Sequence, residues 1–290
     1  MKFASSDGIT PVPLTREHLA SLAPRPADGH KGTFGRIAVI GGAVGMSGAA
    51  YLAAKAAYRA GAGIVEIFCP EENRVIYQTL LPEAVLTLYD NNDPDLRALH
   101  QVLKRADAVA LGMGLGTDRL CRDFLHMTLT YCDKPLVLDA DALNLLSCSD
   151  EHMRLLVGRG LPTVLTPHVG EAARLLHSTV ADIKKDPIAA ALTLAQNTNS
   201  IVALKDAKTL ITDGTTLYCN TFGNNGMATG GSGDVLAGII SAFAVRNSAL
   251  TAATLGVLTH ALAGDAAAKH CGTHGTMASD IIDGLRQILP

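Results

Sequence analysis

Short runs of aliphatic residues alternate along the chain with longer stretches of helical periodicity. The run "RIAVIGG" covers residues 36–42, an alanine-rich helical pattern follows at 47–63, and "IVEIFCP" forms the next run at 64–70. Aliphatic runs of this length between helices are typical of buried parallel strands. The pattern therefore predicts a strand, a helix and a second parallel strand.

The alternation continues through the middle of the chain. Each further run ends in Gly, Asp or His, and a helical pattern usually comes next. These runs lie at 106–116, 135–146, 162–176 and 200–214. The stretch "DGTTLYCN" predicts a hairpin return with one antiparallel piece at that edge. From Asp234 onward the pattern predicts two or three helices.

No linker, internal repeat or low-complexity tract interrupts this series. We therefore predict one α/β domain over residues 30–290, with a mostly parallel central sheet and helices on both faces. Residues 1–29 are irregular and rich in Pro, and they predict an arm with a short helix that Thr15 can cap. Ligands of such sheets bind at the carboxyl ends of the strands, where polar and glycine residues follow several predicted strands.

Composition and charge exclude several classes of function. Hydrophobic residues make up 48% of the 290 residues and aromatics 4%, so the core must pack Ala, Leu, Ile and Val closely. A net charge of -3 without long runs of Lys or Arg argues against a nucleic-acid surface. Six scattered cysteines predict reduced thiols. With neither a signal peptide nor a membrane-length apolar run, we expect a cytoplasmic protein.

The stretch "ATGGSGDVLAG" carries the main candidate chemistry. Its glycines let backbone amides approach an anion, and the helix that follows adds the positive end of its dipole. An aspartate repels a bound phosphate, but it can accept the proton of a hydroxyl that attacks phosphorus. We predict phosphoryl transfer, with Asp234 as the base and an anion hole of Gly230, Gly231, Ser232 and Gly233. A glycine turn with an aspartate N-cap is the alternative. The sequence contains no GxxxxGK[ST] motif, so it does not predict a P-loop.

Seven stretches in order resemble a known family. "ATGGSGDVLAG" is similar to the signature of ribokinase-like kinases, and the chain as a whole resembles the ADP- or ATP-dependent NAD(P)H-hydrate dehydratases. The stretches are "HKGTFGRIAVIGG", "AGAG", "LGMGLG", "LDADALNLL", "TPHVGE", "ALKDAKTLITDG" and "GNNGMATGGSGDVLAG". Each alone could arise by chance, but seven in this order are specific.

The resemblance implies a three-layer ribokinase-like fold and a repair reaction. In this family, the hydroxyl of (6S)-NADHX or NADPHX is phosphorylated by a nucleotide, and elimination of phosphate restores NADH or NADPH. The resemblance favours ADP over ATP as the donor, with AMP and phosphate as products, and it implies Mg²⁺ and a homotetramer. About 30 residues precede the first core strand, so we expect the related epimerase to be a separate partner.

The resemblance also implies positions for the ligands. The NAD(P)HX substrate would contact Asp234, His168 and small residues, which could instead serve close packing: Ala49, Ala50, Gly114 and Gly116. The nucleotide would contact Gly233 and one segment that could also be a solvated strand end: Lys205, Asp206, Ala207, Lys208 and Thr209.

Metal ligands stay open between two accounts. Asp139, with Asp141, could hold Mg²⁺ through water, or Asp141 could cap a helix. For Glu171, the resemblance implies a region that relatives use for magnesium, whereas an acid at the start of a helix is also favoured by the helix dipole.

Two residues depart from the family pattern. Asp206 replaces the usual glycine, and if that position needs positive φ, Asp tolerates it better than most residues. Asn225 replaces the usual proline, which loosens the entry to the glycine loop.

Two other functions fit the same motifs less well. A small-molecule kinase of the hydroxyethylthiazole or pyridoxal type would share the fold, but "HKGTFG" and "TPHVGE" favour the dehydratase. A non-catalytic nucleotide sensor would have no use for a base at Asp234.

Overall fold

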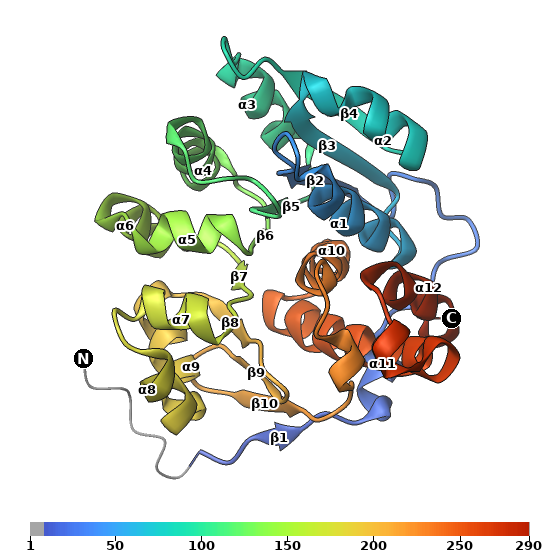
Figure 1. The fold of residues 1–290 in the computed structure, drawn as a ribbon, viewed down its shortest axis with the longest axis vertical. Helices are drawn as coiled ribbons and strands as arrows, with labels where there is room; N and C mark the ends of the chain where they lie inside the picture. The colour runs from blue at the N-terminus through green and yellow to red at the C-terminus, as the bar shows by residue number, and fades with distance from the viewer. Residues whose placement is uncertain (1–8, 290) are drawn as a thin grey trace.

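The computed structural model describes residues 9–289. Its strands form one ten-stranded sheet in the order β1-β10-β9-β8-β7-β6-β5-β2-β3-β4 (Figure 1). The strands are β1 (Val12–Pro13), β2 (Arg36–Ile40), β3 (Ile64–Pro70), β4 (Val85–Tyr89), β5 (Ala108–Leu111), β6 (Leu136–Leu138), β7 (Thr163–Leu165), β8 (Ile201–Leu204), β9 (Thr209–Thr212) and β10 (Leu217–Asn220).

Most of the sheet is parallel, as predicted. The pairings from β4 through β3, β2, β5, β6 and β7 to β8 are all parallel. The hairpin predicted at 213–220 is confirmed by the antiparallel pairing of β9 with β10. The run 200–214 contains two strands, because β8 turns back after Leu204 and pairs antiparallel with β9. The strand β4, at the edge of the sheet, was not predicted, because it lies outside the glycine-terminated runs.

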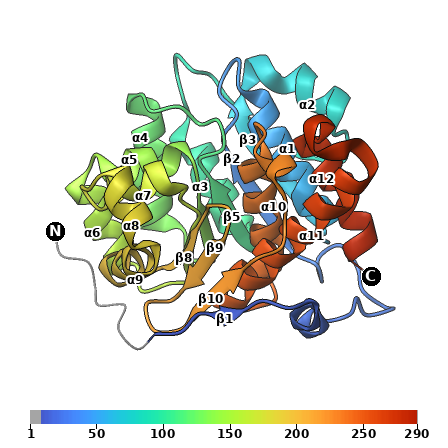
Figure 2. The ribbon, with the colours of Figure 1, turned by 60° about the horizontal axis from the view of Figure 1, so that its bottom comes forward.

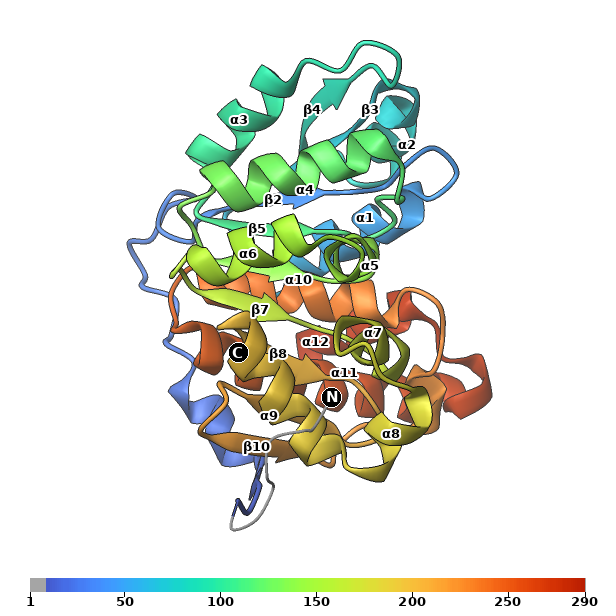
Figure 3. The ribbon, with the colours of Figure 1, turned by 90° about the vertical axis from the view of Figure 1, so that its left-hand side faces the viewer.

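Helices cover both faces of the sheet. In Figure 1, α3 to α9 lie to the left of the strands, and α1, α10, α11 and α12 lie to the right. Figure 3 shows α4, α5 and α6 on the near face, with α10 and α11 beyond the sheet. The helices are α1 (Ser47–Arg59), α2 (Arg74–Leu80), α3 (Leu96–Arg105), α4 (Arg119–Tyr131), α5 (Asp141–Ser147), α6 (Asp150–Gly158), α7 (Val169–Leu175), α8 (Val180–Lys185), α9 (Pro187–Thr198), α10 (Ser232–Ala244), α11 (Ala249–Gly275) and α12 (Ala278–Ile288).

Two hydrophobic cores follow from the pleat of the strands. On β2, Ile37 and Val39 face the cluster under α1 and α10 to α12, whereas Ala38 and Ile40 face the cluster under α3 to α9. Neighbouring side chains on a strand point to opposite faces, so continuous aliphatic runs are what a sheet buried on both faces requires. Glycine and alanine bring the helices close: a Cβ at Gly238 would collide with the backbone of Ala53 on α1.

The described part of the N-terminal arm extends the sheet. β1 lies parallel to β10 along the bottom of Figure 2. The helix predicted after Thr15 is the 3-10 helix η1 (Arg16–Ser21), which contacts α11. Leu19 of this helix and Leu22, which follows it, pack against the hydrophobic core under α1 and α10 to α12. Among the described residues, no helix has both the length and the apolar character needed to cross a membrane.

Candidate active site

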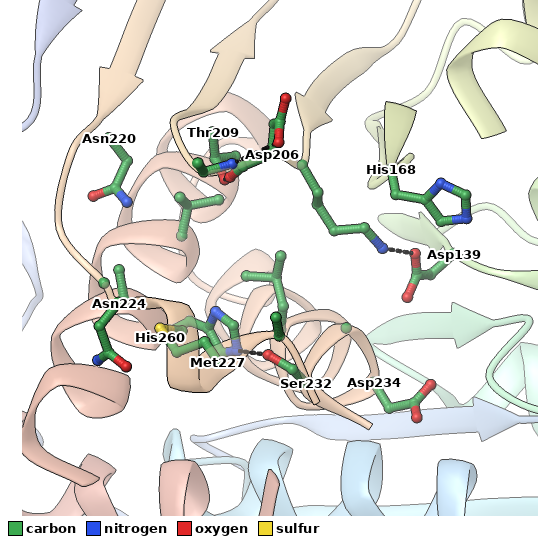
Figure 4. A pocket seen from close by; sticks show the side chains of 18 of the residues that line it. Asp139, His168, Asp206, Thr209, Asn220, Asn224, Met227, Ser232, Asp234 and His260 are labelled. Carbon is green, nitrogen blue, oxygen red and sulfur yellow. Dashed lines mark hydrogen bonds and ion pairs between the residues drawn. The ribbon is translucent and has the colours of Figure 1, made fainter. Parts of the chain in front are cut away.

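A pocket of about 900 Å³ opens at the carboxyl ends of the central strands (Figure 4). Asp139 follows β6, His168 follows β7 and Lys205 follows β8, and all three line the pocket. The helices α10 and α11 contribute Asp234 and His260 from the opposite wall. Polar residues distant in the sequence therefore meet where the sheet topology predicts a ligand site.

The N-terminus of α10 faces this pocket without a side-chain cap. Its N-cap residue is Gly231, with φ 89°, and no side chain there accepts a hydrogen bond from the first amides. A Cβ at Gly231 would also collide with Leu52. The positive φ is the main reason for glycine here, because the Leu52 methyl group is the end of a flexible side chain and can shift. The Ser232 amide donates to the Thr229 carbonyl oxygen at 3.3 Å, so the Gly233 amide and the helix dipole are the groups suited to hold an anion here.

Asp234 lies in the first turn of α10 and is not its cap, so the alternative of an aspartate N-cap is wrong. Burial raises the pKa of Asp234 to about 7, and the negative charge of Asp139 adds to this, while Lys205 opposes it. A carboxylate with a pKa near the working pH is well suited to accept a proton during a reaction. The geometry is therefore consistent with a general base.

Lys205 places a cation beside the same helix terminus. Its Nζ donates to Oδ1 of Asp139 at 2.7 Å, and the Asp139 side chain is only 2% exposed. The Nζ also lies 3.3 Å from the position that a Cβ on Gly233 would occupy. Burial lowers the pKa of the Lys205 ammonium. The negative charges of Asp139, Glu171 and Asp234 have a larger combined effect, so the pKa of Lys205 is raised. The side chain stays an ammonium that can attract phosphate oxygens.

His168 is the N-cap of α7. Its Nδ1 accepts hydrogen bonds from the amides of Gly170 at 2.9 Å and Glu171 at 3.3 Å, and Glu171 accepts from the His168 amide at 2.8 Å. Burial and the nearby Lys205 lower the pKa of His168. The ring is therefore neutral, and its proton lies on Nε2, 3.3 Å from Oε1 of Glu171. Its contact with a nicotinamide stays a prediction, beside this capping role.

The turn between β8 and β9 carries the predicted nucleotide segment. Asp206, Ala207 and Thr209 line the main pocket with Lys205, whereas Lys208 lines a neighbouring cavity of about 260 Å³. Asp206 does not have positive φ, so replacing glycine there imposes no backbone strain. Its carboxylate accepts the Ala207 amide at 2.8 Å and so stabilises the turn.

The small residues predicted for the substrate lie outside the lining of that pocket. A Cβ on Gly114, which has φ 59°, would come within 2.9 Å of the Ala49 Cβ and of the Met46 carbonyl oxygen, which supports the packing account for this glycine. Ala50 is 0% exposed, so only Ala49 of the two alanines has surface that a ligand can reach. Substrate contact at these positions stays a prediction.

Asp141 does not cap α5, whose N-cap is Ala140. Its Oδ2 accepts the amide of Gly116 at 2.8 Å. The described residues hold no group of three or more His, Cys, Asp or Glu placed to bind a metal ion. Metal binding by Asp139 and Glu171 remains a prediction.

Two site residues on α11 were missed by sequence reasoning. The first, His260, is 9% exposed and lies 3.3 Å from the Ser232 hydroxyl through Nε2. Burial lowers its pKa to about 4. The second, Asp265, accepts the amide of Gly223 at 3.1 Å and Nδ2 of Asn224 at 3.0 Å. The available signal in the sequence was that these two ionisable residues interrupt a mainly apolar helical stretch, which would have marked them as candidates for the site.

Comparisons with known proteins show the family and the fold. The family model described as NAD(P)H-hydrate dehydratase matches residues 37–287. An ADP-dependent (S)-NAD(P)H-hydrate dehydratase of Neisseria meningitidis is 41% identical over 269 residues, which cover 90% of this chain and 87% of the relative. A bifunctional NAD(P)H-hydrate repair enzyme of Moorella thermoacetica is 41% identical over 283 residues, covering 93% of this chain and 52% of the relative. The chain thus spans about half the length of such bifunctional relatives.

The fold matches a solved structure along nearly its whole length. The ADP/ATP-dependent NAD(P)H-hydrate dehydratase of Bacillus subtilis, co-crystallised with ATP/Mg²⁺, superposes with a TM-score of 0.82 at 27% identity, covering 98% of each chain. The predicted ribokinase-like fold is confirmed. From the matched residues, the identity and the fold together, this chain belongs to the NAD(P)H-hydrate dehydratase family.

Proposed function

We propose that this protein converts (6S)-NADHX and NADPHX to NADH and NADPH, with ADP as the phosphoryl donor. The observation that carries the proposal is the position of Asp234: a half-buried carboxylate with a pKa raised to about 7, in the first turn of a helix without a side-chain cap, beside the Lys205 ammonium. Binding alone needs the cation and the amides but not the base. Family membership supplies the substrate class.

The first step is phosphoryl transfer. Asp234 accepts the proton of the hydroxyl at C6 of the hydrate while that oxygen attacks the terminal phosphorus of ADP, and AMP leaves. The Gly233 amide at the start of α10, together with Lys205, holds the oxygens of the transferred group. Because these donors are fixed before the reaction, they stabilise the developing charge with little reorganisation.

The second step is elimination. The C6–O bond breaks and phosphate leaves with its electron pair, while the pair of the C5–H bond forms the C5=C6 double bond and the proton is released. The net reaction consumes the hydrate and ADP and yields the reduced cofactor, AMP and phosphate.

ADP is proposed ahead of ATP on the strength of the relatives. The Neisseria meningitidis protein is named ADP-dependent, whereas the Bacillus subtilis protein is named ADP/ATP-dependent. The segment Lys205 to Thr209 would bind the nucleotide, since four of its five residues line the pocket that the α10 amides also face.

We propose Mg²⁺ as the companion of the nucleotide. Mg²⁺ keeps several waters and usually takes one or two carboxylates plus substrate phosphates, so the absence of a three-ligand cluster among residues 9–289 fits this mode. Asp139 and Glu171 would hold its water shell. When bound, the ion neutralises phosphate charge.

Location and partners are part of the same proposal. The six cysteines are all free, which suits a cytoplasmic protein. An epimerase is proposed as the partner activity that supplies the S form of the hydrate, since relatives named bifunctional repair enzymes extend beyond the part that this chain matches. A homotetramer is proposed from the family resemblance, and the apolar side chains exposed on α2 and β4 at one edge of the sheet, among them Val75 at 72% and Leu80 at 50%, are candidates for its contacts.

The function is tested by mixing the purified protein with hydrated NADH, Mg²⁺ and either ADP or ATP. We expect the reduced-nicotinamide absorbance to return with ADP, together with phosphate and AMP. A stable phosphorylated product, or no recovery with either nucleotide from folded protein, would point to the small-molecule kinase instead. A screen of hydroxyethylthiazole and pyridoxal as acceptors then identifies its substrate.

A further inference from the structure

The Ser232 hydroxyl stands at the start of α10, among the amides that face the pocket. Ser232 is the first residue of this helix, and it is 9% exposed. Within residues 9–289, the side-chain hydrogen-bond partner of this hydroxyl is His260, from α11, whose Nε2 lies 3.3 Å from the Ser232 oxygen. The two side chains meet at the pocket wall, as Figure 4 shows.

The direction of this hydrogen bond decides what Ser232 can offer a phosphate. If the Ser232 hydroxyl donated to the ring, only oxygen lone pairs would face an incoming anion. If Nε2–H of His260 donates to the Ser232 oxygen, the hydroxyl hydrogen is free to point into the pocket. A phosphate group, which carries acceptors alone at neutral pH, selects the second arrangement.

Burial of His260 keeps this donor neutral. The pKa of His260 falls to about 4, chiefly through burial and further through the charge of Lys205, while a hydrogen bond with the Ser232 backbone acts in the opposite direction. One ring nitrogen then carries a proton, and the ring adds no net charge to the site. A neutral donor can orient the hydroxyl without itself trapping the anionic nucleotide.

We propose that His260 is a positioning residue for phosphoryl transfer: it donates from Nε2 to Ser232, so that the serine hydroxyl donates to the terminal phosphate in the anion hole. This inference rests on the proposed function, because it requires a nucleotide whose terminal phosphate is transferred. His260 acts through Ser232 and touches neither the base nor the hydroxyl that attacks.

The test compares His260→Leu, His260→Gln and Ser232→Ala, alone and as the double variant with His260→Leu. Leucine removes the hydrogen bond, whereas the glutamine amide can place a donor near the former Nε2. Thr259→Val serves as the packing control, since Thr259 is the buried neighbour on α11 and lies outside the pocket lining. Thermal unfolding midpoints check that each variant folds.

The first readout is calorimetric binding of ADP and of AMP, which differ by the phosphate that enters the anion hole. We expect His260→Leu to weaken ADP by about 10-fold and to leave AMP within about twofold, with Thr259→Val like wild type. Equal weakening of both nucleotides would overturn the proposal, because it would place His260 at the base or ribose. A wild type that binds ADP no better than AMP would overturn it too.

The second readout is turnover of hydrated NADH. We expect kcat to fall about 10- to 100-fold in His260→Leu and in Ser232→Ala, and no further in the double variant. His260→Gln should recover most of the loss. Multiplying losses in the double variant, or a glutamine variant as impaired as the leucine variant, would overturn the proposal. Absence of turnover in wild type would count against the dehydratase function alone, and the ADP and AMP affinities would still decide the role of His260.

Discussion

The chemistry of the site depends on how one cation is shared by three acids. Asp139 pairs directly with Lys205, and the charges of Glu171 and Asp234 also act on the same ammonium. Since the cation is engaged mainly by Asp139, it compensates the burial of Asp234 only in part, and that carboxyl keeps a pKa of about 7. The residue type alone suggests that Asp234 is a base, but its burial and the charges of Asp139 and Lys205 bring its pKa close to neutral pH.

We predict that Asp234→Asn lowers kcat by several orders of magnitude and leaves the affinity for ADP nearly unchanged. The amide keeps the size and polarity of the side chain but cannot accept the proton in the transition state. Steady-state kinetics with hydrated NADH and calorimetry with ADP measure the two effects. A loss confined to ADP affinity would contradict the role of Asp234 as a base.

We predict that kcat/KM rises with pH and levels off above about 7. Asp234 must be deprotonated to act, and its pKa is raised to about 7, so activity is lost as the pH falls through that value. The decline should approach about tenfold per pH unit on the acid side. A pH profile of hydrate repair, at constant ionic strength, checks this, and a rate that stays flat down to about pH 5 would exclude Asp234 as the base.

We predict that Lys205→Met shifts that pH profile to higher pH. Lys205 lowers the pKa of Asp234, and removing the cation leaves Asp139 buried and unpaired. The same change should destabilise the fold by about 3–5 kcal/mol. The matched control is Lys184→Met, an exposed lysine on α8, for which we expect the wild-type profile. An unshifted profile in Lys205→Met would refute the charge coupling.

At the scale of elements, α11 holds the glycine loop that precedes α10 in place through contacts at both ends of the loop. Asp265 binds the loop entry at Gly223 and Asn224, and His260 lies against Ser232 at its exit. Asn225 begins the short 3-10 helix η3 (Asn225–Met227), whose entry is held by the Asn224 cap on Gly226. The loop is therefore ordered without the proline usual at Asn225.

Asp265→Ala is predicted to raise the KM for ADP by about 10-fold, with a smaller effect on kcat. The change leaves Asn224 and the Gly223 amide without their carboxylate, so the pocket wall must be ordered when the nucleotide binds. Kinetics at varied ADP concentration measure the split. The control is Asp283→Ala on α12, where the carboxylate contacts an exposed arginine. A fall in kcat at unchanged KM would contradict a role in ordering the loop.

The elements themselves follow from local patterns, with two instructive misses. The strand runs and two or three helices after the glycine loop were predicted from periodicity, and the structure has three helices there, α10, α11 and α12. The run 200–214 gave no sign of the reversal between β8 and β9, because the turn at Asp206 uses ordinary backbone angles without glycine. The edge strand β4 has partly exposed side chains and thus a weak buried-strand signal.

For the whole molecule, the α2 and β4 edge gives a prediction about assembly. We expect the wild type to be a tetramer by light scattering, and Val75→Asp combined with Leu80→Asp to reduce its mass, since a charge is costly in an apolar contact. Val180→Asp, at a residue 46% exposed on α8, is the control that should leave the mass unchanged. A monomeric wild type would contradict this use of the edge.

The sequence by itself determined the layered fold, the edge of the sheet that carries the chemistry, and the pairing of a glycine loop with Asp234. These are local properties, because strand runs, turn residues and helix starts are encoded by neighbours in the chain. Only the tertiary structure decided the pairing of Asp139 with Lys205, 66 residues apart, and of Ser232 with His260, 28 residues apart. It also decided the raised pKa of Asp234, since burial and distant charges arise only when the chain closes around the site.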